Sequence, residues 1–172
     1  KLTVAVDKVA ASGGYMMACV ANHIIAAPFA ILGSIGVLAQ IPNFNKLLKK
    51  HDIDFEQISA GKYKRTLTMF GENTDADRDK LKEELEETHI LFKEFVKENR
   101  DKIDIEKIAT GEHWYGKQAL ELGLIDEIIT SDDYLTAATA TADIYAIEYV
   151  RKKTFFEKLF SSTIKLFQDD NY

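Results

Sequence analysis

The sequence has one cysteine, four histidines and no long apolar run. A single cysteine, Cys19, excludes a disulfide within the chain. No stretch reaches the roughly 18 consecutive apolar residues typical of a membrane-spanning helix. Histidine, cysteine and carboxylate residues are not grouped at the spacing of a zinc site, and neither a GxGxxG nor a P-loop motif is present. We therefore expect no metal and no nucleotide cofactor.

The chain also lacks an excess of basic residues. Its 22 lysines and arginines against 28 aspartates and glutamates give a net charge of −6, which argues against a nucleic-acid partner. Its 172 residues, 46% hydrophobic and 29% charged, are sufficient for one globular domain with a core. A strand pattern begins directly at Lys1, without methionine or a signal peptide. We expect a fragment of a longer protein, whose targeting or membrane segment lies outside it.

Alternating strand and helix patterns predict an α/β domain. The predicted strands are 2–6, 23–27, 53–58, 124–129 and 145–150. The predicted helices are 15–20, 43–51, 74–100, 118–122, 134–142 and 154–167, with a further helical turn or two over 105–109. Thr74 and Asp77 match a capping box at the start of the longest helix, Ser131 is expected to cap helix 134–142, and 111–116 is predicted to be a turn. We expect a domain over 1–131 and a helix–strand–helix extension over 132–172.

Ser12 lies where a strand pattern gives way to a helix pattern, and Gly13 and Gly14 follow it directly. Glycines here allow a sharp turn and the close approach of a substrate backbone. The start of a helix offers unpaired N–H groups to a negatively charged oxygen. This arrangement suits a serine nucleophile. Serine is also a favoured N-cap residue in an ordinary strand–helix turn, so the local pattern leaves both interpretations open.

A nucleophilic serine needs a base, and one class of candidate is histidine. His51 ends a lysine-rich helix and His89 lies on the long surface helix, so both are predicted to be solvated. His23 and His113 remain possible partners, although nothing in their flanking sequence distinguishes them.

The other class of candidate is lysine, which acts as a base only where apolar surroundings and the absence of a nearby carboxylate favour its neutral form. Lys64 follows the predicted strand 53–58, has aromatic and apolar residues on both sides, and has no acidic residue near it in the sequence. A solvated lysine beside Arg65 is the ordinary alternative, so Lys64 alone is a weak signal.

Three motifs, in order and spacing, resemble the signal peptide peptidase A family of serine peptidases. They are Ala-Ser-Gly-Gly-Tyr at 11–15, Leu-Gly-Ser-Ile-Gly-Val at 32–37 and Ser-Ala-Gly-Lys-Tyr-Lys-Arg at 59–65. The segments 111–119 and 123–127 are similar to the family's closing segment. The likeness extends from Lys1 to about Ser131. Segments 9–19 and 64–68 look most like one branch of the family from Gram-negative bacteria.

The resemblance implies a Ser–Lys peptidase on a ClpP/crotonase-like spiral of ββα units, incomplete at its N-terminus in this chain, with no cofactor. Ser12 would be the nucleophile and Lys64, rather than Lys62, the general base. Ser34 would hydrogen-bond the lysine ammonium and hold it toward Ser12. The Gly13 N–H would supply part of the oxyanion hole.

In the family the remaining oxyanion donors lie upstream of this chain's start, and losing one such donor costs about 10²–10³ in rate in a related chemistry. We therefore expect the fragment alone to be weakly active or inactive. The resemblance further implies peptide or protein substrates, an N-terminal membrane anchor, a position on the periplasmic side of the bacterial inner membrane and a ring-like homo-oligomer. The dyad would form within one protomer or between two.

Two other functions stay open at this point. A crotonase-like acyl-CoA enzyme would share the fold and the oxyanion chemistry without needing Lys64. A non-catalytic oligomeric scaffold would bind unfolded or membrane peptides and would keep its phenotype when Ser12 is replaced by alanine.

Overall fold

A computed structural model describes residues 1–61 and 63–149 of the chain. Contacts between residues divide the chain into one unit of Lys1–Ala137 and a second unit that begins at Ala138. Among the described residues, all of the strands and nearly all of the helical residues belong to the first unit. The mixed α/β character predicted from the sequence is confirmed.

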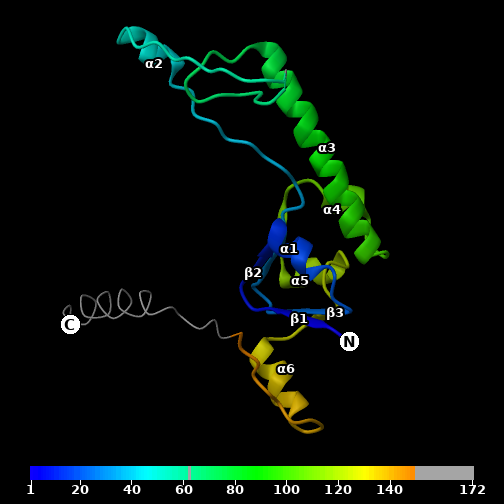
Figure 1. The fold of residues 1–172 in the computed structure, drawn as a ribbon. Coiled ribbons are helices and arrows are strands. Elements are labelled where there is room, and N and C mark those ends of the chain that lie inside the picture. The colour runs from blue at the N-terminus through cyan, green and yellow to red at the C-terminus, as the bar shows by residue number, and fades with distance from the viewer. Residues whose placement is uncertain (62, 150–172) are drawn as a thin grey trace, which may run out of the picture. The chain divides into compact units, whose positions relative to one another are not determined.

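Two small sheets form the centre of the first unit (Figure 1). One sheet has three parallel strands in the order β1 (Thr3–Val6), β3 (His23–Ala26) and β6 (Glu127–Ile128). The other has the order β2 (Val9–Ala11), β4 (Ile31–Gly33) and β5 (His113–Tyr115), with β2 and β4 parallel and β4 and β5 antiparallel. The chain thus runs through β1 and β2 and then repeats the path through β3 and β4, so that β3 lies parallel to β1 and β4 lies parallel to β2.

The described residues also form six helices. They are α1 (Gly13–Ala18), α2 (Asn45–Lys50), α3 (Asp75–Asn99), α4 (Ile105–Ile108), α5 (Gly116–Glu121) and α6 (Ser131–Ala138). The capping box predicted for the longest helix is confirmed at α3. The Thr74 Oγ accepts from the Asp77 N–H at 3.2 Å, and the Asp77 carboxylate accepts from the Thr74 N–H at 2.9 Å.

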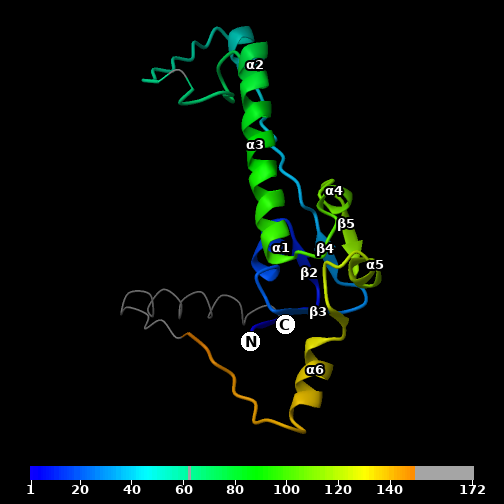
Figure 2. The same cartoon turned by 90° about the vertical axis from the view of Figure 1, so that its right-hand side faces the viewer.

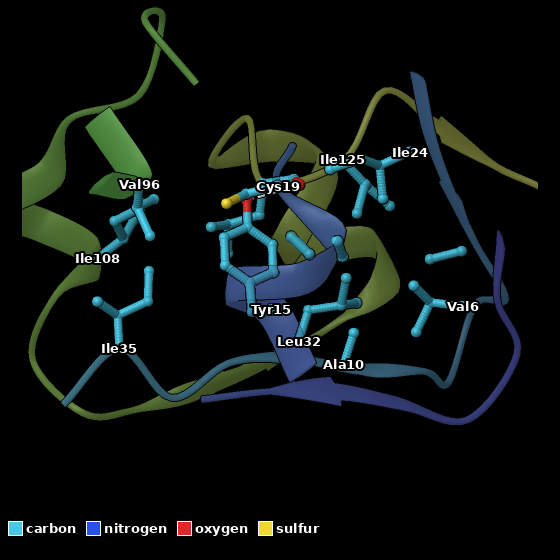
Figure 3. Packing of buried hydrophobic residues seen from close by; sticks show 14 of the residues in the cluster. Val6, Ala10, Tyr15, Cys19, Ile24, Leu32, Ile35, Val96, Ile108 and Ile125 are labelled. Carbon is cyan, nitrogen blue, oxygen red and sulfur yellow. Dashed lines mark hydrogen bonds between the residues drawn. The ribbon is translucent and has the colours of Figure 1, made fainter. Parts of the chain in front are cut away.

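The hydrophobic core lies between the sheets, α1 and the C-terminal half of α3 (Figure 3). Cys19 is fully buried, which confirms its predicted role as a small core residue. Tyr15 is also fully buried, and its hydroxyl donates to the Leu124 carbonyl at 2.8 Å. Burial raises the pKa of the Tyr15 hydroxyl. This bond satisfies the one polar atom that α1 brings into the core.

Arg100, which follows α3, connects that helix to the loop before β6. Its guanidinium donates to both carboxylate oxygens of Asp126, at 2.9 and 3.0 Å, and to the Gly123 carbonyl at 2.8 Å. The Asp126 carboxylate also accepts from the Ile24 N–H at 2.7 Å. Partial burial alone would raise the pKa of Asp126, but the hydrogen bonds from Arg100 and Ile24 outweigh it, so the pKa of this carboxyl lies below its ordinary value.

The lowered pKa of Asp126 predicts an acid-dependent part of the stability. A depressed pKa stabilises the folded state fully above the unfolded pKa of about 3.9, and this contribution is lost as the pH falls below that value. We expect Asp126→Asn to lower the free energy of unfolding in urea at pH 7, and the difference from the original chain to shrink at pH 3. The exposed Asp101→Asn is the control. An Asp126→Asn deficit that is the same at both pH values would contradict the prediction.

The N-terminal half of α3 carries an arm formed by α2 and the segment 53–71. Figure 1 shows α2 set apart from α3, on the side of its N-terminal end, and Figures 1 and 2 show α1 and α5 toward the other end of α3. Asn43 and Asn45 tie the two parts of the arm together, since their side-chain amides donate to three carbonyls in 68–71. The rings of Phe44, Phe55 and Phe70 cluster there, with centroids 5.7 and 6.0 Å apart.

None of the described residues of the arm is buried. Between Ile35 and Phe92 every described side chain is at least partly exposed, and Ile58 is 95% exposed. The arm is therefore held by aromatic contacts and by hydrogen bonds to its backbone, and its described residues form no buried core.

Several sequence predictions in the arm and beyond β6 are wrong. Residues 53–58 form no strand, because the described chain offers no neighbouring strand to their backbone, and the exposed 145–149 are also irregular. The predicted turn 111–116 contains β5, which pairs with β4. The predicted helix 134–142 begins at Ser131 and ends at Ala138, and the Thr130 hydroxyl, rather than that of Ser131, accepts from the Asp133 N–H. Residue 150 and the predicted helix 154–167 lie outside the described residues.

Candidate active site

Ser12 occupies the turn between β2 and α1. Its backbone has φ 52° and ψ −120°, and a positive φ is uncommon for residues other than glycine. The Ser12 N–H donates to the Gly33 carbonyl at 2.8 Å, and the Ser12 carbonyl accepts from Tyr15 and Met16 in the first turn of α1. Ser12 stands at the N-cap, yet its exposed side chain makes no capping hydrogen bond. Ser12 therefore holds the N-cap position of a strand–helix turn, as one interpretation expected, but its hydroxyl does not cap the helix.

Ser34 lies beside Ser12 because of the register of β2 and β4. Ala11 pairs with Gly33, so the next residue of each strand leaves the sheet at the same edge. Ser34 also has a positive φ of 51°, and its N–H donates to the Glu112 carbonyl at 2.7 Å. Gly33, at φ 93°, has no room for a side chain, since an added Cβ would lie 2.7 Å from the Trp114 ring. The turn is fixed by backbone contacts on both sides.

Ser12, Gly13 and Ser34 line one open cavity of about 940 Å³. Its other walls come from α1, from the segment after β4, from the C-terminal half of α3 and from the loop before β5. These residues are Met16, Gly36, Val37, Leu38, Thr88, His89, Leu91, Phe92, Phe95, Thr110 and Gly111. Most of these side chains are apolar. The cavity could therefore hold an apolar side chain of a peptide next to the Ser12 hydroxyl.

The structure does not bring Lys64 to this cavity within one chain. Lys64 lies in a turn in which its N–H donates to the Gly61 carbonyl at 3.2 Å. It is exposed, and it lines a separate cavity of about 690 Å³ formed by residues 55, 57–60, 64–65 and 68–70. The strand expected to precede it is absent, although Met69 and Phe70 do line the same cavity, as their proximity in the sequence suggested. Lys62 lies outside the described residues.

The length of α3 shows how far apart the two regions are. Asp77, in the first turn of α3, lines a small cavity together with Arg65. The Ser12 cavity begins at Thr88 on the same helix. At about 1.5 Å per residue, Asp77 and Thr88 are separated by about 16 Å along the helix axis. Ser12 and Lys64 are thus associated with different parts of α3.

The surroundings of the four histidines agree only in part with the sequence prediction. His89 was expected to be solvated, but it is partly buried and lines the Ser12 cavity. His51, at the C-cap of α2, is exposed as expected. His23 contacts the Glu127 carboxylate at 3.3 Å, and His113 packs edge-on against Tyr115 in β5. Neither His23 nor His113 lines the Ser12 cavity.

The sequence signal for His89 was its spacing. His89, Phe92 and Val96 follow at i, i+3 and i+7 on α3, and the last two are buried, so all three lie on the inward face of the helix. The charged residues around His89 obscured this pattern.

A model of the family described as "Peptidase family S49" matches residues 1–145 of the chain. The chain belongs to peptidase family S49. The resemblance predicted from the three motifs is thereby confirmed, and the relatives below carry the SohB name, which is the branch that segments 9–19 and 64–68 indicated.

Three relatives of this S49 chain illustrate the match. The protein named "Probable protease SohB" from Haemophilus influenzae is 59% identical over 158 residues, which cover 92% of this chain and 45% of the relative. Its namesake from Buchnera aphidicola subsp. Acyrthosiphon pisum is 54% identical over 180 residues, covering 100% of this chain and 54% of the relative. The protein of the same name from Buchnera aphidicola subsp. Schlechtendalia chinensis is 64% identical over 135 residues, which cover 78% of this chain and 44% of the relative.

The S49 chain spans about half the length of the curated relatives it matches. Within residues 1–61 and 63–149, no helix is long and apolar enough to cross a membrane. The same residues contain no group of three or more histidine, cysteine or acidic side chains that could hold a metal ion.

Proposed function

We propose that the protein to which this chain belongs is a serine endopeptidase, with Ser12 as its nucleophile and Lys64 as its general base. The observation that carries the proposal is the placement of Ser12. Its hydroxyl makes no capping bond, its backbone is held at a positive φ, and it lies with Gly13 and Ser34 at a largely apolar cavity in an S49 chain. Strained backbone of this kind clusters at functional sites. Membership in S49 favours a peptidase over the acyl-CoA enzyme considered from the sequence.

In the proposed mechanism, the neutral amine of Lys64 takes the proton of the Ser12 hydroxyl while the serine oxygen attacks a peptide carbonyl. The Gly13 N–H, at the start of α1, donates to the developing oxyanion. The protonated lysine then gives its proton to the leaving amine, and the peptide bond breaks to leave an acyl-enzyme. Lys64 then takes a proton from water as the water oxygen attacks the ester, and it returns that proton to the Ser12 oxygen as the acyl group leaves. The Ser34 hydroxyl accepts a hydrogen bond from the lysine ammonium and orients it.

We further propose that Lys64 reaches Ser12 from a neighbouring copy of the chain. In one chain Lys64 is exposed and lines a cavity other than that of Ser12. A lysine serves as a base only when water is excluded from it, and the residues that the structure describes leave Lys64 exposed, so the cover must come from beyond them. The arm has no buried residue between Ile35 and Phe92 among those described, and its exposed apolar surface suits an interface. A homo-oligomer would supply both the cover and the base.

The remaining expectations follow from the family. We propose that the two strand pairs β1–β2 and β3–β4 are successive turns of a ClpP/crotonase-like spiral of ββα units, a view supported by their parallel pairing. The boundary between a peptidase domain, 1–131, and an extension, 132–172, belongs to the same proposal. So do peptide or protein substrates, an N-terminal anchor and a catalytic domain on the periplasmic side of the inner membrane.

Covalent labelling tests the nucleophile and the base. The full-length protein is treated with a serine-directed fluorophosphonate and analysed by intact mass. We expect one adduct on the original protein and none on Ser12→Ala or Lys64→Ala, whereas the control Lys62→Ala is labelled normally. The absence of an adduct on the original protein would favour a peptide-binding scaffold. Labelling that persists in Lys64→Ala would show that another base activates Ser12.

A further inference from the structure

Among the described residues that line the Ser12 cavity, His89 has the one ionisable side chain. It comes from α3, where its inward position is shared with Phe92, buried one turn later. The cavity is otherwise formed by apolar side chains, small hydroxyl residues and backbone. A partly buried imidazole in this setting needs a hydrogen-bond partner.

The partner of His89 is the segment that carries Ser34. The His89 Nε2 lies 3.3 Å from the Ile35 carbonyl oxygen. A carbonyl can only accept, so this ring nitrogen carries the proton and donates. The Ile35 carbonyl also accepts from the Gly111 N–H at 3.1 Å. The carbonyl therefore retains a hydrogen-bond partner when the histidine is replaced.

Three successive residues of this segment are fixed by different neighbours. The Gly33 carbonyl accepts from Ser12, the Ser34 N–H donates to Glu112, and the Ile35 carbonyl accepts from Gly111 and His89. The first three of these bonds are backbone to backbone. His89 alone among these partners uses a side chain, and it alone belongs to α3, the helix that leads back to the Lys64 arm.

We propose that His89 is a positioning residue that holds the Ser34–Ile35 segment against α3 and so fixes the Ser34 hydroxyl for its task of orienting the lysine. This inference rests on the proposed function. His89 touches neither the reacting atoms nor the proton being transferred. It acts through the Ile35 carbonyl, one residue away from Ser34, in a turn where Ser34 is held at a positive φ.

Two substitutions of similar length separate the hydrogen bond from the bulk of the ring. Glutamine in His89→Gln places an amide donor close to the position of Nε2, and methionine in His89→Met fills similar space without a donor. We expect His89→Met to lower kcat about tenfold, with KM changed by less than about threefold, because small displacements of a positioned group slow the chemical step. His89→Gln should remain within about threefold of the original protein in both constants.

The measurement is the rate of fluorophosphonate labelling of the full-length protein, together with kcat and KM on an apolar peptide substrate. The final labelled fraction reports how much protein is correctly folded. Glu94→Met, on the exposed face of α3, is the matched control and should label at the original rate. Slow labelling in His89→Met to the full final fraction, with normal labelling in His89→Gln, supports the proposal.

Equal labelling rates in the original protein, His89→Met and His89→Gln would overturn the role of His89. Equal slowing of labelling in His89→Met and His89→Gln would also overturn it. These results differ from failure of the proposed function, in which the original protein would not be labelled at all or would be labelled independently of Ser12. A reduced final fraction in His89→Met, with an unchanged rate for the fraction that reacts, would show a purely structural role and would also overturn the proposal.

Discussion

Mixing two inactive variants of the full-length protein, Ser12→Ala and Lys64→Ala, is expected to restore peptidase activity. Each variant alone should lose about 10⁴-fold or more in kcat, since a nucleophile and its base act as a unit. If Lys64 serves the Ser12 of a neighbouring copy, an equal mixture contains sites with both groups intact. Half of the serines and, independently, half of the neighbouring lysines are unaltered, which gives about one quarter of the original activity.

The experiment requires exchange of subunits, so the variants should be mixed after dissociation or produced together in one cell. The double variant Ser12→Ala/Lys64→Ala, combined with the original protein, is the control. In that mixture about one quarter of the sites should again be complete, because both groups are intact only in neighbouring pairs of original chains. A mixture of the single variants that stays inactive, while the control mixture is active, would place the dyad within one chain.

The largest effect on stability is expected at Gly116, the first residue of α5. Gly116 is buried, and an added Cβ would lie 2.4 Å from the Ala27 carbonyl oxygen and 3.1 Å from that of Pro28. Both obstacles are backbone atoms at the end of β3, which cannot rotate away as a side chain could. Gly116→Ala should therefore lower the free energy of unfolding by about 3 kcal/mol, at the upper end of the range for overpacking.

The control for Gly116→Ala is Gly14→Ala in α1. An added Cβ at Gly14 would meet no atom within 4 Å, and alanine is favoured over glycine within helices by up to about 1 kcal/mol. In urea denaturation, Gly116→Ala should therefore have a lower free energy of unfolding than the original chain. Gly14→Ala should have a free energy of unfolding that is slightly higher or little changed. Equal stability of both variants would show that β3 and α5 can separate at little cost.

The elements that were predicted correctly from the sequence are those whose stabilising contacts are indicated by the local pattern of residues. The capping box at Thr74 and Asp77 and the apolar spacing of α3 lie within one helix, so a local pattern contains the information. Strand β1 is a short apolar run that pairs with another such run, β3. In these cases side-chain pattern and backbone pairing indicate the same structure.

The failures concern partners that are distant in the sequence. The alternating pattern of 53–58 predicted a strand, but a strand needs a neighbour for its N–H and carbonyl groups, and none is present in the described chain. Conversely, His113–Tyr115 looked like a turn because of its flanking glycines, yet it pairs with β4. A periodic pattern shows which face of a segment is apolar and does not show whether another strand lies beside it.

The candidate site likewise depends on contacts between residues that are distant in the sequence, so only part of it could be predicted. Ser12 and Ser34 come together because β2 and β4 pair in register, a relation that the motifs indicated only through resemblance to a family. His89 was missed because its partner is a backbone carbonyl more than fifty residues away. The separation of Lys64 from Ser12 depends on how α3 leaves the core, which no local pattern contains.

The position of the arm at the far end of α3 has a consequence for when such a protease could act. In the proposed arrangement, a newly synthesised chain carries a nucleophile without a base and a base without a nucleophile. Such a chain does not cleave other proteins while it is dilute, and it becomes active when it associates with further copies of itself. Many proteases achieve this delay with a pro-segment that must be cut away, whereas here a helix about seven turns long would serve as the safeguard and would make the onset of hydrolysis reversible.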